Sequence, residues 1–436
     1  MSSLSVRARR VIPGGANSGA RIIGGLDELV ITSAQGATVT DEHGRTYVDY
    51  HVAYGPVILG HADEDVLAAV TQACRRVDIV GVGVTPVEVE LAEKITSLVP
   101  CAEQVVLLGT GTEATFYAVR LARGVTGRRL LVKFQGCFHG SHDAVAMNVI
   151  SAPDRVGVKD PLSIGILPEV VDATLVLPFN DLEAVRAAVA EHGDDIAAII
   201  LEPIPHNVGA ILPEQEFLVG LREICDRRGI VLIFDEVITG FRHGLGGYQA
   251  VCGVTPDVTA LGKAMANGYP IAALAGRRDL LEQFSTVPGG PVMLAGTYNG
   301  HPGMVAAALE TIRKLEEEPV HEHLFRLGDL ARRGLQEMFD EHGVAARVTG
   351  FGSVWVSYFL EGPVTTYTDL LRNDAELYVG YRRRLLEHGI LELPVNLKRN
   401  HFTYAHREHH VEQLIEATAA AVTAELEARA LLGGRG

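Results

Sequence analysis

Two apolar runs, one followed by an acid and the other by a lysine, constrain the fold of this chain more than any other feature. The first run, 230–234 (IVLIF), follows Gly229 and stops at Asp235. The second run, 257–261 (DVTAL), ends just before Lys263. Short runs rich in β-branched residues are typical of strands buried on both faces of a parallel sheet. Because open α/β sheets bind ligands at the carboxyl ends of their strands, we expect Asp235 and Lys263 to meet at one sheet edge.

Similar runs alternate with helical patterns through the middle of the chain. The strand-like runs are 104–108, 129–134, 196–201, 230–234 and 257–261, and the helical patterns between them include 115–123, 182–192 and 216–228. Regular alternation of strands and helices predicts an α/β fold built on a large, doubly wound and mostly parallel sheet.

The two ends of the chain follow a different pattern. From about residue 320 the order is helix, strand, strand, helix, which predicts a smaller α+β domain that packs with the N-terminal segment. We therefore expect an N-terminal arm and small-domain segment over 1–59, a large domain with the binding edge of the sheet over 60–314, and a C-terminal small domain over 315–436. The irregular stretch 150–170 is long enough to be a lid.

Charge and cysteine content narrow the possible partners and location. The formal net charge is −16 without a basic cluster, which disfavours nucleic acid and anionic membranes as partners. The five cysteines form no Cys-x-x-Cys pair, and no apolar run approaches the ~20 residues of a membrane span. The N-terminal segment lacks the apolar stretch of a secretion signal. We expect a cytoplasmic protein that binds neither nucleic acid nor membrane.

A glycine-rich turn follows the first strand-like run and predicts a phosphate site. In 109–114 (GTGTEA) the glycines allow the backbone to approach an anion, and free N–H groups at the helix start can donate to it. The same letters fit a dinucleotide fingerprint, which requires an acid at the end of the next strand to hold a ribose. That strand, 129–134, ends in Gln135-Gly136. The missing acid weakens a nicotinamide site but not a monophosphate site.

An acid and a lysine at one sheet edge, beside a phosphate cradle, favour one cofactor in particular. The acid can hold a pyridinium nitrogen protonated and the lysine can form a Schiff base with a carbonyl. Phe138, after the next strand, is placed to stack on an aromatic ring. These features together indicate pyridoxal 5′-phosphate.

Histidines occur close together in two places. They are His139 and His142, and His406, His409 and His410. Neither set has an acid or thiol at ligand spacing, so we expect no metal.

With these motifs, the chain resembles the class III aminotransferase group of fold-type I pyridoxal-phosphate enzymes. The most specific motifs are 111–114 (GTEA), 133–140 (KFQGCFHG), 234–242 (FDEVITGFR) and 261–263 (LGK). The similarity runs nearly end to end, beginning at 13–18 (PGGANS), and is strongest to glutamate-1-semialdehyde 2,1-aminomutase and its transaminase relatives.

The resemblance implies a role for each matching position. Lys263 would be the catalytic lysine and Asp235 the partner of the pyridinium nitrogen. The other cofactor contacts it implies are Gly111, Thr112, Phe138, His139, Glu202, Val237 and Thr297, with Asn207 nearby. Thr297 would reach the phosphate of the neighbouring subunit, which implies a homodimer with its site at the interface. Arg21 matches the arginine that holds the substrate carboxylate in the aminomutase, and 150–165 matches its mobile gate.

Several positions depart from the family pattern. Gly109-Thr110 stands where Asn-Ser is usual, and Pro205-His206 replaces a small Ala-Gly pair. Tyr54 stands where a tryptophan is expected near the substrate, and Lys398 where a glutamate is expected. These changes favour a substrate other than glutamate semialdehyde. We assign Arg21, Tyr54 and Lys398 to substrate binding, since Lys398 and the neighbouring Arg399 would suit an acidic substrate if they face the site.

The motifs lead us to expect an aminotransferase that moves an amino group from an amino-acid donor to a carboxylate-bearing ketone or aldehyde. The alternative on the same cofactor is intramolecular transfer of the aminomutase type. Two other classes remain open at this stage, a nicotinamide dehydrogenase that uses 109–114 and a non-catalytic pyridoxal-phosphate-binding regulator. The pairing of Lys263 with Asp235 argues against the regulator, because a pure binder needs no proton shuttle.

Overall fold

A seven-stranded sheet forms the centre of the computed structural model, which describes residues 3–26 and 29–433. The strand order is β4 (Gln104–Leu108), β10 (Ala272–Gly276), β9 (Val258–Leu261), β8 (Val231–Glu236), β7 (Ile196–Leu201), β5 (Leu130–Phe134) and β6 (Thr174–Leu177). Strand β10 is antiparallel to both of its neighbours, and all other pairs are parallel. The predicted α/β fold with a mostly parallel sheet is confirmed.

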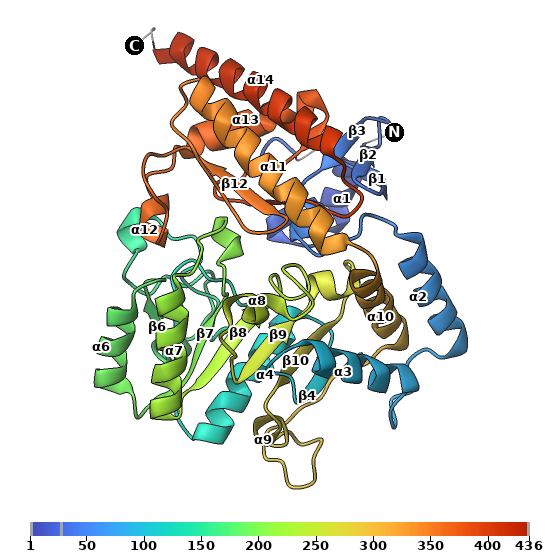
Figure 1. Ribbon diagram of the computed structural model, residues 1–436, viewed down its shortest axis with the longest axis vertical. Helices are drawn as coiled ribbons and strands as arrows, with labels where there is room; N and C mark the ends of the chain where they lie inside the picture. The colour runs from blue at the N-terminus through green and yellow to red at the C-terminus, as the bar shows by residue number, and fades with distance from the viewer. Residues whose placement is uncertain (1–2, 27–28, 434–436) are drawn as a thin grey trace.

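Helices cover both faces of this sheet (Figure 1). They are α2 (Glu64–Arg76), α3 (Pro86–Leu98), α4 (Gly111–Thr126), α5 (Pro168–Asp172), α6 (Leu182–His192), α7 (Gln215–Arg228), α8 (Gly247–Cys252), α9 (Arg278–Leu281) and α10 (Pro302–Glu317). Val231 and Ile233 of β8 join the core under α4 and α9, whereas Leu232 and Phe234 join the core under α6 and α7. The alternation explains why β8 is apolar throughout.

Local signals set the ends of these helices. Asp181 caps α6 by accepting a hydrogen bond from the Ala184 N–H at 2.9 Å, and α6 ends before Gly193 as the sequence predicts. Helix α7 ends at Gly229, which adopts φ 60°, a conformation that glycine tolerates best. The chain then enters β8 directly, so this turn determines where β8 begins.

A second, smaller unit combines both ends of the chain. Its helices are α1 (Leu4–Val11), α11 (Val320–Glu341), α12 (Tyr367–Leu370), α13 (Ala375–Leu385) and α14 (Glu408–Gly433). One sheet contains β11 (Arg347–Thr349), β12 (Val354–Tyr358) and β14 (Asn400–His401). The other contains β1 (Ile31–Gln35), β2 (Thr38–Asp41), β3 (Thr46–Asp49) and β13 (Ile390–Leu391). Since β13 pairs with β3, the N-terminal segment packs with the C-terminal part, as expected.

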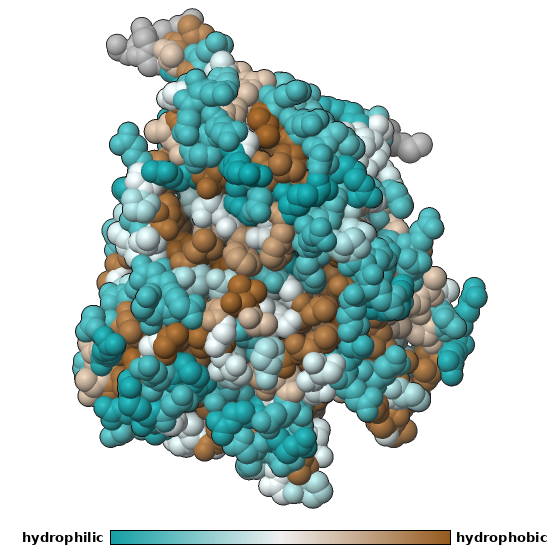
Figure 2. All heavy atoms as spheres, in the orientation of Figure 1, coloured by the Kyte–Doolittle hydropathy of each residue, from teal (hydrophilic) through white to brown (hydrophobic). Residues whose placement is uncertain are grey.

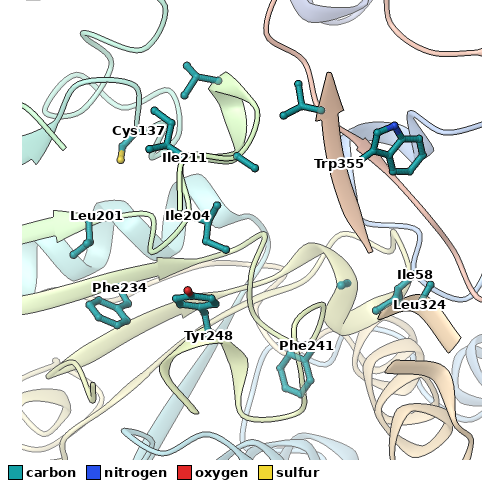
Figure 3. Close-up of a cluster of buried hydrophobic side chains, with 14 of the residues drawn as sticks. Ile58, Cys137, Leu201, Ile204, Ile211, Phe234, Phe241, Tyr248, Leu324 and Trp355 are labelled. Carbon is teal, nitrogen blue, oxygen red and sulfur yellow. The ribbon is translucent and has the colours of Figure 1, made fainter. Parts of the chain in front are cut away.

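One continuous hydrophobic core joins the two units. Figure 3 shows Leu201 and Phe234 of the large sheet in the same cluster as Leu324 of α11 and Trp355 of β12. The Trp355 ring stacks on Phe402 with a centroid distance of 4.5 Å. The small unit is therefore held firmly above the edge of the large sheet.

Polar side chains cover most of the surface on the face drawn in Figure 2, and a band of apolar side chains crosses its middle. Among the described residues, no helix is both long and apolar enough to cross a bilayer.

Candidate active site

The predicted acid and lysine lie at the same edge of the sheet. Strands β8 and β9 are parallel neighbours, with Asp235 opposite Ala260, and Lys263 follows the end of β9. Both line a cavity of about 290 Å³. Eight residues predicted from the sequence share this lining: Gly111, Thr112, Phe138, His139, Glu202, Asp235, Val237 and Lys263. Residues from five separate segments thus converge on one cavity.

Asp235 is buried and fixed by two hydrogen bonds. Its Oδ1 accepts from the Val237 N–H at 3.1 Å, and its Oδ2 accepts from His139 Nδ1 at 2.8 Å. His139 is buried, and burial lowers its pKa despite the neighbouring carboxylate. A neutral His139 that donates through Nδ1 leaves Asp235 with its negative charge and a fixed orientation.

Lys263 has the altered basicity expected of a reactive amine. Burial lowers its pKa to about 8, and the positive charge of Arg399 acts in the same direction, while Asp235 and Glu202 oppose the shift. Its backbone adopts φ 47°, which is uncommon for a residue other than glycine and is characteristic of functional sites.

Glu202 lines the same cavity and is buried. Its Oε2 accepts from the Phe138 N–H at 2.8 Å. Burial, together with the nearby Asp235, raises the pKa of Glu202 to about 8, while the Phe138 N–H and the charge of Arg399 oppose the shift. Near neutral pH, a proton can therefore reside on this carboxyl group.

The start of α4 leaves backbone N–H groups free where the sequence predicts an anion cradle. Glu113 Oε2 accepts from the N–H groups of Gly109 and Thr110, both at 2.9 Å. Within the described residues, the N–H groups of Gly111 and Thr112 have no acceptor and remain free for an anion. A Cβ atom on Gly111 would lie 2.8 Å from Val237 Cγ1, so only glycine fits this approach.

Pyridoxal 5′-phosphate fits the polar groups that this cavity offers. The free N–H groups suit its phosphate, the Asp235 carboxylate suits a protonated ring nitrogen, and the Lys263 amine suits its carbonyl. Phe138, 37% exposed, and Val237 also line the cavity, where they would contact the ring of the cofactor. Among the described residues, no cluster of three or more His, Cys, Asp or Glu could hold a metal ion.

Four predicted site residues lie outside the lining of this cavity: Arg21, Tyr54, Thr297 and Lys398. Arg21 and Thr297 are exposed. The Tyr54 hydroxyl donates to the Ala20 carbonyl, which holds the arm beside Tyr54. Lys398 Nζ donates to the Asn207 carbonyl at 3.2 Å, so part of its hydrogen-bonding capacity serves the backbone.

The assignment of site residues from the sequence left out Arg399, which, like Lys398, lies outside the lining of the cavity. It is 4% exposed, its charge acts on Lys263, and its Nη2 donates to the Tyr54 carbonyl at 2.8 Å. The basic pair 398–399 was visible in the sequence, but the sequence did not indicate that the charge of Arg399 acts on Lys263. Arg399 directly precedes β14, so the position of that short strand determines where the Arg399 side chain lies.

The substituted Pro205-His206 pair has partners that the sequence could not reveal. His206 is buried, with Nδ1 3.2 Å from the Gly209 carbonyl oxygen and Nε2 3.1 Å from His243 Nε2.

At the base of the predicted gate, the Tyr367 hydroxyl donates to the Ser151 carbonyl at 2.7 Å. The small unit thus anchors one end of the stretch 150–165.

Comparisons with known proteins agree with this geometry. The family model "Aminotransferase class-III" matches residues 24–422. Glutamate-1-semialdehyde 2,1-aminomutase from Akkermansia muciniphila is 41% identical over 95% of this chain and 97% of that protein. The enzyme of the same name from Thermomicrobium roseum is 41% identical over 96% and 97%.

Solved structures show the same fold. An omega-transaminase from Sphaerobacter thermophilus superposes with a TM-score of 0.91 at 35% identity, covering 97% of each chain. A structure described as a transaminase with PLP bound gives a TM-score of 0.88 at 31% identity, covering 98% of this chain and 99% of that one. This chain therefore belongs to the class III aminotransferase family and is a pyridoxal 5′-phosphate-dependent enzyme.

Proposed function

We propose that this enzyme moves an amino group between neighbouring carbons of one carboxylate-bearing substrate, as the name glutamate-1-semialdehyde 2,1-aminomutase states for its relatives. The observation that carries the proposal is the similarity to enzymes of this name at 41% identity over 95% of the chain, together with a cavity that contains the amine and acid such a transfer uses. The comparisons favour this intramolecular alternative over the transfer between two molecules that the sequence first led us to expect.

The proposed roles follow from the contacts in the cavity. Bound pyridoxal phosphate would act as an electron sink for the substrate carbon that loses its proton. Asp235, oriented by His139, would hold the pyridinium proton. With a pKa lowered to about 8, the Lys263 amine would take a proton from substrate carbon and return it. The N–H groups of Gly111 and Thr112 would bind the phosphate.

The substrate carboxylate would bind near Tyr54. The charges of Arg399 and Arg21 both act on the Tyr54 hydroxyl and lower its pKa, although burial raises that pKa overall. The two guanidinium groups therefore approach Tyr54 from different segments of the chain. Guanidinium groups bind carboxylates strongly, so this region is the natural anchor for the acid end of a substrate.

We also propose that the functional unit is a homodimer with Thr297 completing the neighbouring site. Support comes from the exposure of Thr297 and its absence from the cavity of its own chain. A cytoplasmic location remains a prediction from the sequence.

A donor-free assay tests the proposal. The purified enzyme, loaded with pyridoxal phosphate, is given glutamate 1-semialdehyde without any other amine. Exchange of the amino group and the carbonyl oxygen between C1 and C2 leaves the formula unchanged, so we expect 5-amino-4-oxopentanoate to form. Lys263→Ala should form none. Lack of product with the unmodified enzyme would reject the proposal.

A second candidate is amino transfer between two molecules, and one observation favours it. Lys398 places positive charge where the resemblance leads us to expect a glutamate in the aminomutase, and the neighbouring Arg399 is buried, with its charge acting on Lys263. Such a change suits a different acidic substrate. If no product forms without a donor, but glutamate or alanine restores amino transfer to an oxo acid, this candidate replaces the first.

A further inference from the structure

Arg399 is buried and forms no ion pair within the described part of the chain. Burial lowers its pKa to about 10, and the negative charge of Glu202 opposes this shift. Two acceptors hold its guanidinium group. Nη2 donates to the Tyr54 carbonyl at 2.8 Å and Nε donates to His401 Nε2 at 3.3 Å. Within the described residues, Nη1 forms no hydrogen bond. It is also not among the fully buried polar atoms that lack a partner, so it retains some accessible surface. One end of Arg399 is fixed and the other is available.

The His401 imidazole, which accepts from Arg399 Nε, must be neutral. His401 is 1% exposed, and burial lowers its pKa well below its usual value, with further lowering by Arg399 and Arg242. An imidazole that accepts through Nε2 carries its proton on Nδ1. Nδ1 is buried and has no partner among the described residues, so the ring is oriented by Arg399 and by packing.

The Tyr54 carbonyl, the backbone acceptor of Arg399, is also held in a fixed position. Val52, Ala53 and Tyr54 have φ values of 41°, 55° and 69°, three consecutive residues in the left-handed region. Asp49 Oδ1 accepts from the N–H groups of His51 and Val52, and Arg242 Nη2 donates to the Gly55 carbonyl at 2.7 Å. These contacts fix the strained turn and with it the Tyr54 carbonyl that Arg399 contacts.

We propose that His401 is a positioning residue for substrate recognition, because its Nε2 fixes the Arg399 guanidinium so that Nη1 is presented to the substrate carboxylate. This inference rests on the carboxylate anchor of the proposed function. His401 does not contact the reacting atoms in this role. It makes Arg399 a preorganised donor, which avoids the entropy cost of ordering a free arginine when the carboxylate binds.

Two amide substitutions provide a matched test. In His401→Gln the amide oxygen can reach the position of Nε2 and accept from Arg399, whereas in His401→Asn it reaches only the position of Nδ1. The probe is glutarate, which has carboxylates but no amine or carbonyl to react. Its dissociation constant is measured by titration calorimetry on the protein loaded with pyridoxal phosphate. Arg399→Leu is measured in parallel, and His401→Phe provides a second removal of the acceptor if the Asn variant does not fold.

We expect Arg399→Leu and His401→Asn each to weaken glutarate binding about tenfold or more, the usual effect of losing a charged hydrogen bond, with His401→Gln within about threefold of the unmodified protein. With a reacting substrate, His401→Asn should raise KM and leave kcat nearly unchanged, a split that a merely destabilised protein does not show. Equal binding by the Asn, Phe and Gln variants would reject the role of His401 while leaving the anchor intact. Unchanged binding in Arg399→Leu, or no binding by the unmodified protein, would reject the anchor itself.

Discussion

At the scale of single residues, the lowered pKa of the Lys263 amine predicts how the rate of cofactor uptake depends on pH. An ordinary lysine is almost entirely protonated at neutral pH, and a protonated amine cannot attack a carbonyl. Because burial and the charge of Arg399 lower the pKa of Lys263 to about 8, its neutral fraction should be roughly one tenth at pH 7. We predict that the rate at which apoprotein takes up pyridoxal phosphate rises with pH and reaches half its maximum near pH 8, followed by absorbance in stopped flow.

The Arg399→Leu variant is the control for this pH profile. Loss of a neighbouring positive charge removes one of the factors that lower the pKa of Lys263, so the midpoint should move to higher pH. An uptake rate that continues to rise beyond pH 10 in the unmodified protein would contradict the prediction.

The charge on Asp235 supports a second prediction at this scale. Asparagine keeps the shape and can still accept from the Val237 N–H, but it cannot hold a pyridinium proton by charge. Loss of a preorganised electrostatic partner usually costs on the order of a hundredfold to a thousandfold in rate. We expect Asp235→Asn to lower kcat/KM by that amount while the protein remains folded by circular dichroism. Nearly full activity would remove Asp235 from the mechanism.

At the scale of elements, the sequence predicted the strands and the helix start that line the cavity better than it predicted the residues around the cavity. Local patterns were sufficient for β8, β9 and the start of α4, because apolar runs, turn glycines and a helix cap are properties of neighbouring residues. Strand β10 (AALAG) was not recognised, since alanine and glycine carry little strand preference. The orientation of Lys398 and Arg399 depends on Asn207, Tyr54 and His401, and only the packed small unit brings these groups together.

The contact between the start of α4 and the end of β8 yields a prediction that a second substitution can test by restoring binding. In Gly111→Ala, a Cβ atom 2.8 Å from Val237 Cγ1 must displace the side chain that lies beside the cavity. We expect affinity for pyridoxal phosphate to fall about tenfold or more while the melting temperature of the apoprotein changes little, since alanine suits a helix. Fluorescence titration of the cofactor measures the affinity.

The double variant Gly111→Ala/Val237→Ala provides the matched control. Truncating Val237 removes both methyl groups that the new Cβ would meet, so a substantial part of the affinity should return. If the double variant binds no better than Gly111→Ala, the close approach of these two elements does not control the phosphate site.

At the scale of the whole molecule, the remaining question is whether one chain forms a complete site. The cavity contains the acid, the lysine and the free N–H groups, whereas Thr297 is exposed and outside its lining. If Thr297 completes the phosphate site of a second copy, defects in Lys263 and Thr297 must act in different sites of a mixed dimer. Lys263→Ala removes the amine, and Thr297→Glu places a negative charge beside a phosphate and repels it.

Coexpression of the two variants with different affinity tags then gives a sharp result. A purified mixed dimer contains one site with both defects and one site with neither, so it should show about half the activity of the unmodified dimer, while each variant alone shows almost none. If Thr297 served the site of its own chain, both sites of the mixed dimer would carry one defect and activity would be absent. Measuring the mixed dimer beside both parent variants therefore distinguishes a shared site from a site formed by one chain, and sedimentation velocity on the same samples shows whether the dimer exists in solution.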